Sequence, residues 1–201
     1  VKNLVSVETL GSTTAICSDK TGTLTQNEMT ITKVFTDFKE FDVDGSGYAP
    51  EGKISHEGQV IDSHDQIELL MTIASLSNDA NLIERSGTYE ITGDPTEGAM
   101  LTLSEKWGIV QEDLNEAHPR IDEIPFDSDR KMMTTFHKIE DSFYAMTKGA
   151  PDIIIKNSSK IMIDGKLEDF TEDKKNKVLE ENTKLAKQAL RVMAYAFKPY
   201  E

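Results

Sequence analysis

The apolar residues of this chain occur in short runs separated by turn residues, and this spacing limits the folds that are open to it. Runs rich in β-branched and other apolar residues predict strands over residues 14–18, 28–36, 121–125, 132–137, 143–147 and 191–198. Near-helical spacing or helix-start signals predict helices over residues 64–78, 94–108, 152–156 and 171–190. Short strands joined by hairpins, with helices between them, predict an α+β domain with a largely antiparallel sheet flanked by helices.

Two of the predicted helices carry start signals. Asp62 or Ser63 is placed to cap the helix over residues 64–78. Residues 94–97 combine an N-cap acid, a proline at the first helical position and a glutamate that can reach back to the cap. Residues 37–58 are polar and glycine-rich, so we expect a loop there with at most short hairpin pieces.

Length and charge narrow the classes of protein and partner. With 201 residues the chain has room for one domain, or for one domain and a fragment of a second. The formal net charge of −14 argues against nucleic acid or an anionic membrane surface as a partner, because both attract clustered Lys and Arg. No run approaches the roughly 20 apolar residues that span a bilayer, so we expect no direct membrane contact. A single cysteine, Cys17, cannot form an internal disulfide or a multi-cysteine zinc site.

The most specific motif follows the first predicted strand and reads Asp19-Lys20-Thr21-Gly22-Thr23-Leu24-Thr25. A carboxylate can attack the terminal phosphoryl group of ATP in line and form an acyl phosphate, and a neighbouring cation offsets the negative charge of the transferred group. The alternative is a Gly-Thr turn after a buried strand. Over its full length the string resembles the phosphorylation loop of the P-type cation-transporting ATPases, and the chain as a whole looks like a type II pump, most like the calcium pumps.

The resemblance implies roles for this loop. Asp19 would be the phosphorylated nucleophile, with Lys20, Thr21 and Thr23 beside the phosphate as further catalytic groups. Asp19 and Thr21 would also contribute to a Mg²⁺ site that this stretch of chain leaves incomplete. Soluble phosphatases of the related haloacid-dehalogenase type carry a second aspartate as general acid/base where this chain has Thr21. Without that carboxylate no local group speeds hydrolysis of the phosphoenzyme.

Further strings resemble the nucleotide-binding parts of the same family: residues 93–97, 125–131, 148–151 and 191–194. Each also has a structural explanation when taken alone, as a capping box, a core phenylalanine, a turn or a helix-terminal cation. The resemblance implies that adenine is met by a carboxylate and an aromatic ring, and the phosphates by cations. The implied nucleotide-binding residues are Glu97, Phe126, Ser128, Lys131, Lys148, Gly149 and Arg191. A calcium pump of the family has an arginine where this chain has Ser128.

The resemblance also implies an organisation and a function. Residues 1–27 would belong to a phosphorylation domain of α/β type and its hinge, and residues 28–201 to the nucleotide-binding domain. The chain would bind ATP with Mg²⁺ on the cytosolic side of an integral membrane pump for Ca²⁺, without turning ATP over alone. Its partners would be the remaining phosphorylation, actuator and transmembrane domains. A Na⁺, K⁺ or H⁺ pump, a soluble phosphatase, and a regulatory nucleotide-binding module remain as alternatives.

Overall fold

A computed structural model describes residues 11–15 and 17–200, and for Thr21 it describes the backbone alone. The described strands form two four-stranded sheets and two separate hairpins, and every pairing is antiparallel. The first sheet has the order β1 (Lys33–Thr36), β2 (Lys39–Val43), β3 (Ile54–His56) and β4 (Gln59–Ile61). The second has the order β12 (Ala194–Tyr200), β9 (Ser142–Gly149), β8 (Met132–Ile139) and β7 (Arg120–Asp127).

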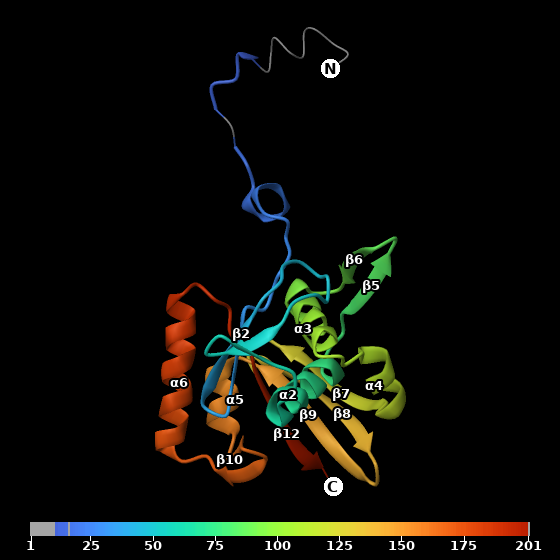
Figure 1. Ribbon diagram of the computed structural model, residues 1–201, viewed down its shortest axis with the longest axis vertical. Coiled ribbons are helices and arrows are strands. Elements are labelled where there is room, and N and C mark those ends of the chain that lie inside the picture. Colours follow the sequence, from blue (N-terminus) through green and yellow to red (C-terminus); the bar gives the residue numbers. More distant parts are fainter. Residues whose placement is uncertain (1–10, 16, 201) are drawn as a thin grey trace.

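The remaining elements lie around these sheets (Figure 1). The hairpins are β5 (Asn81–Arg85) with β6 (Thr88–Thr92), and β10 (Lys160–Ile163) with β11 (Lys166–Asp169). The helices are α2 (Asp65–Leu76), α3 (Pro95–Lys106), α4 (Gln111–Ala117), α5 (Pro151–Asn157) and α6 (Glu172–Lys187), and η1 (Lys20–Leu24) is a single π-helical turn. The predicted α+β class with antiparallel sheets and flanking helices is confirmed. No helix of the described part of the chain has the length and apolar character needed to cross a bilayer.

Helix α2 packs against both large sheets and thereby joins them. Its residues Ile67 and Met71 are fully buried in one core cluster with Phe41 of β2. Its residues Ile73 and Leu76 belong to a second cluster with Met146 of β9. A helix whose apolar residues point in both directions is expected to lie between two layers. Helix α2 therefore determines how the end of β9 lies relative to the rest of the domain.

Several predictions about elements are wrong in part. Residues 14–15 and 17–18 are exposed and form no strand, since none of the described strands lies beside them to satisfy their hydrogen bonds. Strand β1 begins only at Lys33, and β12 begins at Ala194 and continues to Tyr200. The predicted loop over residues 37–58 instead contributes β2 and β3 to a sheet.

The strands within the predicted loop have a physical reason. Phe41 and Val43 alternate with polar residues on β2, and Ile54 follows on β3; all three are buried, at 1–6% exposure. Two apolar residues at a spacing of two are enough for a strand when a helix covers them, although they give too weak a signal in the sequence.

The cap of α2 also differs from the prediction. His64 occupies the N-cap position without a side-chain cap bond, so neither Asp62 nor Ser63 caps the helix. The sequence pattern gave no indication of α4 or of the hairpins β5–β6 and β10–β11.

Candidate functional site

The N-terminus of α3 carries the first predicted nucleotide residue, Glu97, and the local sequence explains its place. Asp94 caps the helix: its Oδ1 accepts hydrogen bonds from the amides of Thr96 at 2.8 Å and Glu97 at 3.3 Å. Pro95 occupies the first turn, where its missing N–H costs nothing. The motif indicated that the Glu97 carboxylate could reach back to the cap, but in the structure it does not. It points instead toward β9 and the end of α2.

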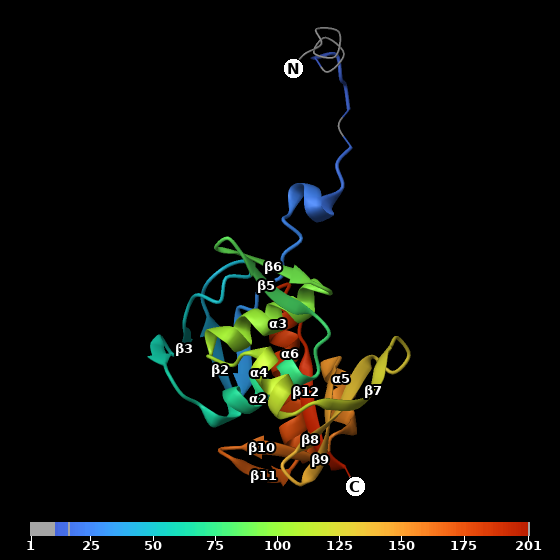
Figure 2. The ribbon, with the colours of Figure 1, turned by 90° about the vertical axis from the view of Figure 1, so that its right-hand side faces the viewer.

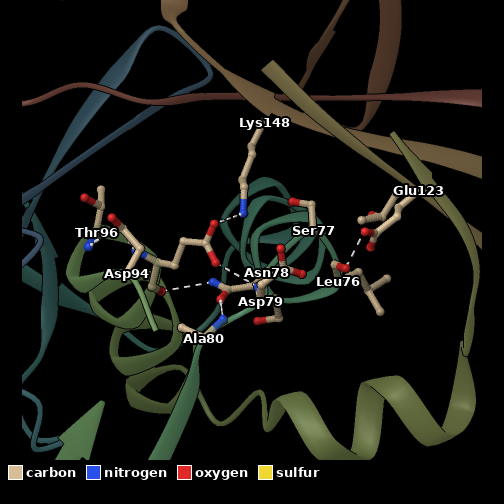
Figure 3. A network of polar contacts seen from close by, with 12 residues as sticks. Leu76, Ser77, Asn78, Asp79, Ala80, Asp94, Thr96, Glu123 and Lys148 are labelled. Carbon is tan, nitrogen blue, oxygen red and sulfur yellow. Dashed lines mark hydrogen bonds and ion pairs between the residues drawn. The ribbon is translucent and has the colours of Figure 1, made fainter. Parts of the chain in front are cut away.

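Lys148 of β9 meets that carboxylate (Figure 3). Its Nζ donates to Glu97 Oε1 at 2.5 Å, and the amide of Asp79 donates to Glu97 Oε2 at 2.8 Å. The side chains of Lys148 and Glu97 are 6% and 17% exposed, so this is a largely desolvated ion pair. An ammonium at such depth is retained only with a charged partner.

Arg191 approaches the same helix terminus from the segment between α6 and β12. Its Nη1 donates to Thr96 Oγ1 at 3.2 Å. Burial by itself would raise the pKa of Asp94, but hydrogen bonds from Thr96 and Glu97 and the charge of Arg191 hold that pKa below its ordinary value. The arrangement places cations on both sides of the α3 N-terminus, whose own free N–H groups favour negative charge.

The turn between β7 and β8 is joined to the end of β9, next to Lys148. The amide of Ala150 donates to the Lys131 carbonyl at 3.0 Å. A Cβ on Gly149 would lie 2.6 Å from that carbonyl oxygen, so the missing side chain admits the neighbouring strand. Phe126 on β7 is 63% exposed, and Ser128 and Lys131 are also exposed.

The structure therefore brings most of the predicted nucleotide residues to one region. Glu97, Lys148 and Arg191 gather at the start of α3, and Gly149 connects them to the turn that carries Ser128 and Lys131. Phe126 is in the same strand-turn-strand unit, on β7.

Sequence reasoning missed a tyrosine and the residues at the end of α2. Tyr195 of β12 lies opposite Lys148 in the strand register. Burial, together with the negative charge of Glu97, raises the pKa of its phenol, which stays protonated. Asn78 donates through Nδ2 to the Glu97 carbonyl at 3.0 Å. The only signal for Asn78 and Asp79 was a polar pair after an apolar helix, which is ordinary for a helix end.

The predicted phosphorylation loop lies apart from this region. Asp19 Oδ1 accepts a hydrogen bond from the amide of Lys20 at 2.7 Å, and the residues that follow form η1. Gly22 has a φ of +72°, which favours glycine. Figures 1 and 2 show this segment, in blue, projecting from the body that contains α3 and β9. Among the described residues, no three acidic, His or Cys side chains are grouped so that they could hold a metal ion. Asp19 offers one carboxylate, which could be one of several oxygen ligands of Mg²⁺.

Comparison with known proteins points to one family. The family described as "P-type ATPase, cytoplasmic domain N" matches residues 66–201. A calcium-transporting ATPase of Bacillus subtilis is 42% identical over 99% of this chain, and calcium-transporting ATPase 1 of Bacillus cereus is 40% identical over all of it. A cation-transporting ATPase of Synechocystis is 36% identical, also over the whole chain. The chain spans only 20–23% of the lengths of these relatives. The match to the family over residues 66–201, with an antiparallel α+β fold, shows that this chain belongs to the P-type ATPases and contains their cytoplasmic domain N.

Proposed function

We propose that this chain is the ATP-binding part of a P-type cation pump and that Asp19 accepts the phosphoryl group. The observation that carries the proposal is the convergence of separate motifs. Lys148 and Glu97 are 51 residues apart in sequence yet form a direct ion pair. Arg191 and Thr96 are 95 residues apart and share a hydrogen bond. Each motif taken alone has a structural explanation. Those separate explanations do not account for the meeting of the motifs at one helix terminus.

The chemistry of the gathered residues suits a purine nucleotide. The Glu97 carboxylate accepts hydrogen bonds, which suits an exocyclic amino group, and the exposed ring of Phe126 offers a face for stacking. Lys131, Lys148 and Arg191 supply positive charge for the polyphosphate in a chain whose net charge is −14. Gly149 leaves room beside the backbone, and Ser128 adds a neutral hydroxyl.

Phosphoryl transfer would take place at Asp19. A carboxylate oxygen attacks the γ-phosphorus, the bond to the bridging oxygen breaks, and ADP leaves as an aspartyl phosphate forms. Lys20 offsets charge there, and Thr21 and Thr23 offer backbone or hydroxyl groups. Mg²⁺, when bound, neutralises phosphate charge. Asp19 and Thr21 would supply some of its ligands, and the others would have to come from residues outside this group.

Two further proposals concern the whole polypeptide. Residues 1–27 would form part of the phosphorylation domain and hinge, and residues 28–201 the nucleotide-binding domain. The pump would place this domain in the cytosol, with the remaining phosphorylation, actuator and transmembrane domains as its partners. The names of the Bacillus relatives favour Ca²⁺ as the transported ion, while the Synechocystis relative keeps Na⁺, K⁺ and H⁺ as alternatives.

Titration of the ¹⁵N-labelled chain with Mg-ATP tests the binding site. We expect amide shifts that cluster at Glu97, Phe126, Lys131, Lys148 and Arg191. Lys148→Met should weaken binding at least about tenfold, because a desolvated charge-assisted contact is lost. The matched control is Lys156→Met, which removes an exposed lysine of α5 and should leave affinity unchanged. A flat response of the wild-type chain at these five residues contradicts the proposal.

Labelling of the polypeptide that contains this chain with [γ-³²P]ATP tests the role of Asp19. The label should be lost in Asp19→Asn. A regulatory nucleotide module would show no dependence on Asp19, and a soluble phosphatase would hydrolyse small phosphomonoesters without a lasting phosphoenzyme. A label on another residue would overturn the assignment.

A further inference from the structure

We propose that Arg120 is a positioning residue for the nucleotide site: it holds the turn at the end of α2, and this turn orients the Glu97 carboxylate that distinguishes adenine from guanine. The inference rests on the proposed nucleotide-binding function. The hydrogen bonds of Arg120 go to this turn and to Glu123, so Arg120 would act on Glu97 only through the turn at residues 76–80.

Arg120 gathers four oxygens at the C-terminal end of α2. Its Nη2 donates to the carbonyls of Asn78 at 2.8 Å and Leu76 at 3.3 Å. Its Nη1 donates to Asp79 Oδ1 at 2.6 Å and Glu123 Oε2 at 2.7 Å. The last carbonyls of a helix lack partners within the helix and attract positive charge. The planar guanidinium can satisfy backbone and carboxylate acceptors together, which an ammonium cannot do with the same geometry.

This turn, held by Arg120, contacts Glu97 at two points. Asn78 Oδ1 accepts from the amide of Ala80 at 2.9 Å, while Asn78 Nδ2 donates to the Glu97 carbonyl at 3.0 Å. The amide of Asp79 donates to Glu97 Oε2 at 2.8 Å (Figure 3). Lys148 takes the other carboxylate oxygen. With each oxygen held by a different donor, the plane of the carboxylate has one orientation.

An oriented carboxylate can discriminate between purine bases. Each carboxylate oxygen has a further lone pair, which can accept a hydrogen bond from the 6-amino group of adenine. Guanine presents a carbonyl oxygen at the same position, and a carboxylate repels it. If Arg120 no longer holds the turn, the Asp79 amide moves and Glu97 can rotate. Adenine then loses its advantage, while the phosphate contacts proposed for Lys131 and Arg191 are unaffected.

The first test needs no nucleotide. In Arg120→Gln we expect faster hydrogen exchange at the Asp79 amide, because its bond to Glu97 weakens. The Thr96 amide, which is bonded to Asp94 Oδ1 at 2.8 Å, should keep its wild-type rate and serves as the internal reference. Arg85→Gln removes an exposed arginine of β5 and should change neither rate. Wild-type protection at Asp79 in Arg120→Gln would overturn the positioning role, whether or not the chain binds nucleotide.

The second test compares Mg-ATP and Mg-GTP affinities by calorimetry. Arg120→Gln should weaken ATP binding about five- to tenfold, the effect of one weakened charge-assisted hydrogen bond, and leave GTP binding nearly unchanged. Arg120→Lys should restore part of the ratio. A parallel loss of both affinities, or equal affinities in the wild-type chain, would overturn the inference. If the wild-type chain binds neither nucleotide, the proposed function fails as well, and the exchange rates still decide whether Arg120 positions Glu97.

Discussion

At the scale of single residues, Lys148 and Glu97 show how a charged pair is maintained in a folded domain. Both side chains are largely removed from water, and each is the nearest opposite charge to the other. Loss of one partner leaves a desolvated charge without compensation, which costs more than loss of both. Each of the two residues is therefore needed to keep the other stable in the folded domain.

A double-mutant cycle measures this coupling. Glu97→Gln keeps an acceptor for the Asp79 amide and removes the charge, and Lys148→Met keeps the aliphatic stem. We expect the single variants to lose stability and the double variant to recover part of it, with a coupling of about 1–3 kcal/mol in urea unfolding. The exposed pair Lys160–Asp169, at 55% and 79% exposure, is the control and should show a coupling of about 0–1 kcal/mol. Additive losses at Glu97 and Lys148 would contradict the prediction.

At the scale of elements, Glu40 of β2 connects the first sheet to helix α6. Its two carboxylate oxygens accept from Lys33 Nζ of β1 at 2.7 Å and Lys184 Nζ of α6 at 2.9 Å. The hydrogen bonds from Lys33 and then Lys184 lower the pKa of Glu40 from 4.5 to about 2. The helix is otherwise highly charged, with Leu185 as its one buried residue. The contact of Lys184 with Glu40 adds an ion pair between this helix and the sheet.

The lowered pKa of Glu40 predicts a pH dependence of stability. The folded state prefers the ionised carboxylate, so its contribution is complete above about pH 4.5 and is lost as the pH falls toward 2. Glu40→Gln should therefore lower the free energy of unfolding by about 0.5–1 kcal/mol at pH 6 and have much less effect near pH 2.5. Glu180→Gln, also on α6, should cost little at either pH. An equal cost of Glu40→Gln at both values would contradict this account.

At the scale of the whole molecule, the described segment before residue 28 is separate from the core. Apart from Thr21, its described side chains are exposed, and residues 18–25 bond to one another, as in Lys20 with Asp19 and Thr25 with Lys20. Packing against the first core cluster begins near Ile31. Stability and nucleotide binding should then reside in residues 28–201, while Asp19, the proposed phosphoryl acceptor, lies outside them.

Removal of residues 1–27 tests this division. The shortened chain should unfold with a free energy within about 0.5 kcal/mol of the full chain, because the side chains described between residues 11 and 27 are all exposed. Its affinity for Mg-ATP should also be unchanged. A matched truncation at residue 36, which deletes β1 and the buried Val34, should be strongly destabilising. If loss of residues 1–27 lowers stability as much as loss of β1, the proposed boundary is wrong.

Local chemistry determined several features of this protein without reference to its tertiary structure. The hairpin β8–β9, the capped start of α3 and the long amphipathic α6 follow from side-chain period, capping residues and turn signals, all of which act within a few residues. Predictions failed where the deciding contact is distant. Strand β2 forms because helix α2 covers Phe41, and residues 14–15 and 17–18 form no strand because none of the described strands lies beside them.

In the candidate site, too, some features follow from the local sequence and others from distant contacts. The motifs identified Glu97, Lys148 and Arg191 one at a time, because each stands in a distinctive local string. Only the tertiary structure decided that Glu97 turns from its own cap to Lys148 and Asp79, and that Arg120 holds the turn beside it. A side chain with several available partners takes the one that leaves the fewest buried charges and polar groups unsatisfied, and that choice depends on which segments the fold places around it.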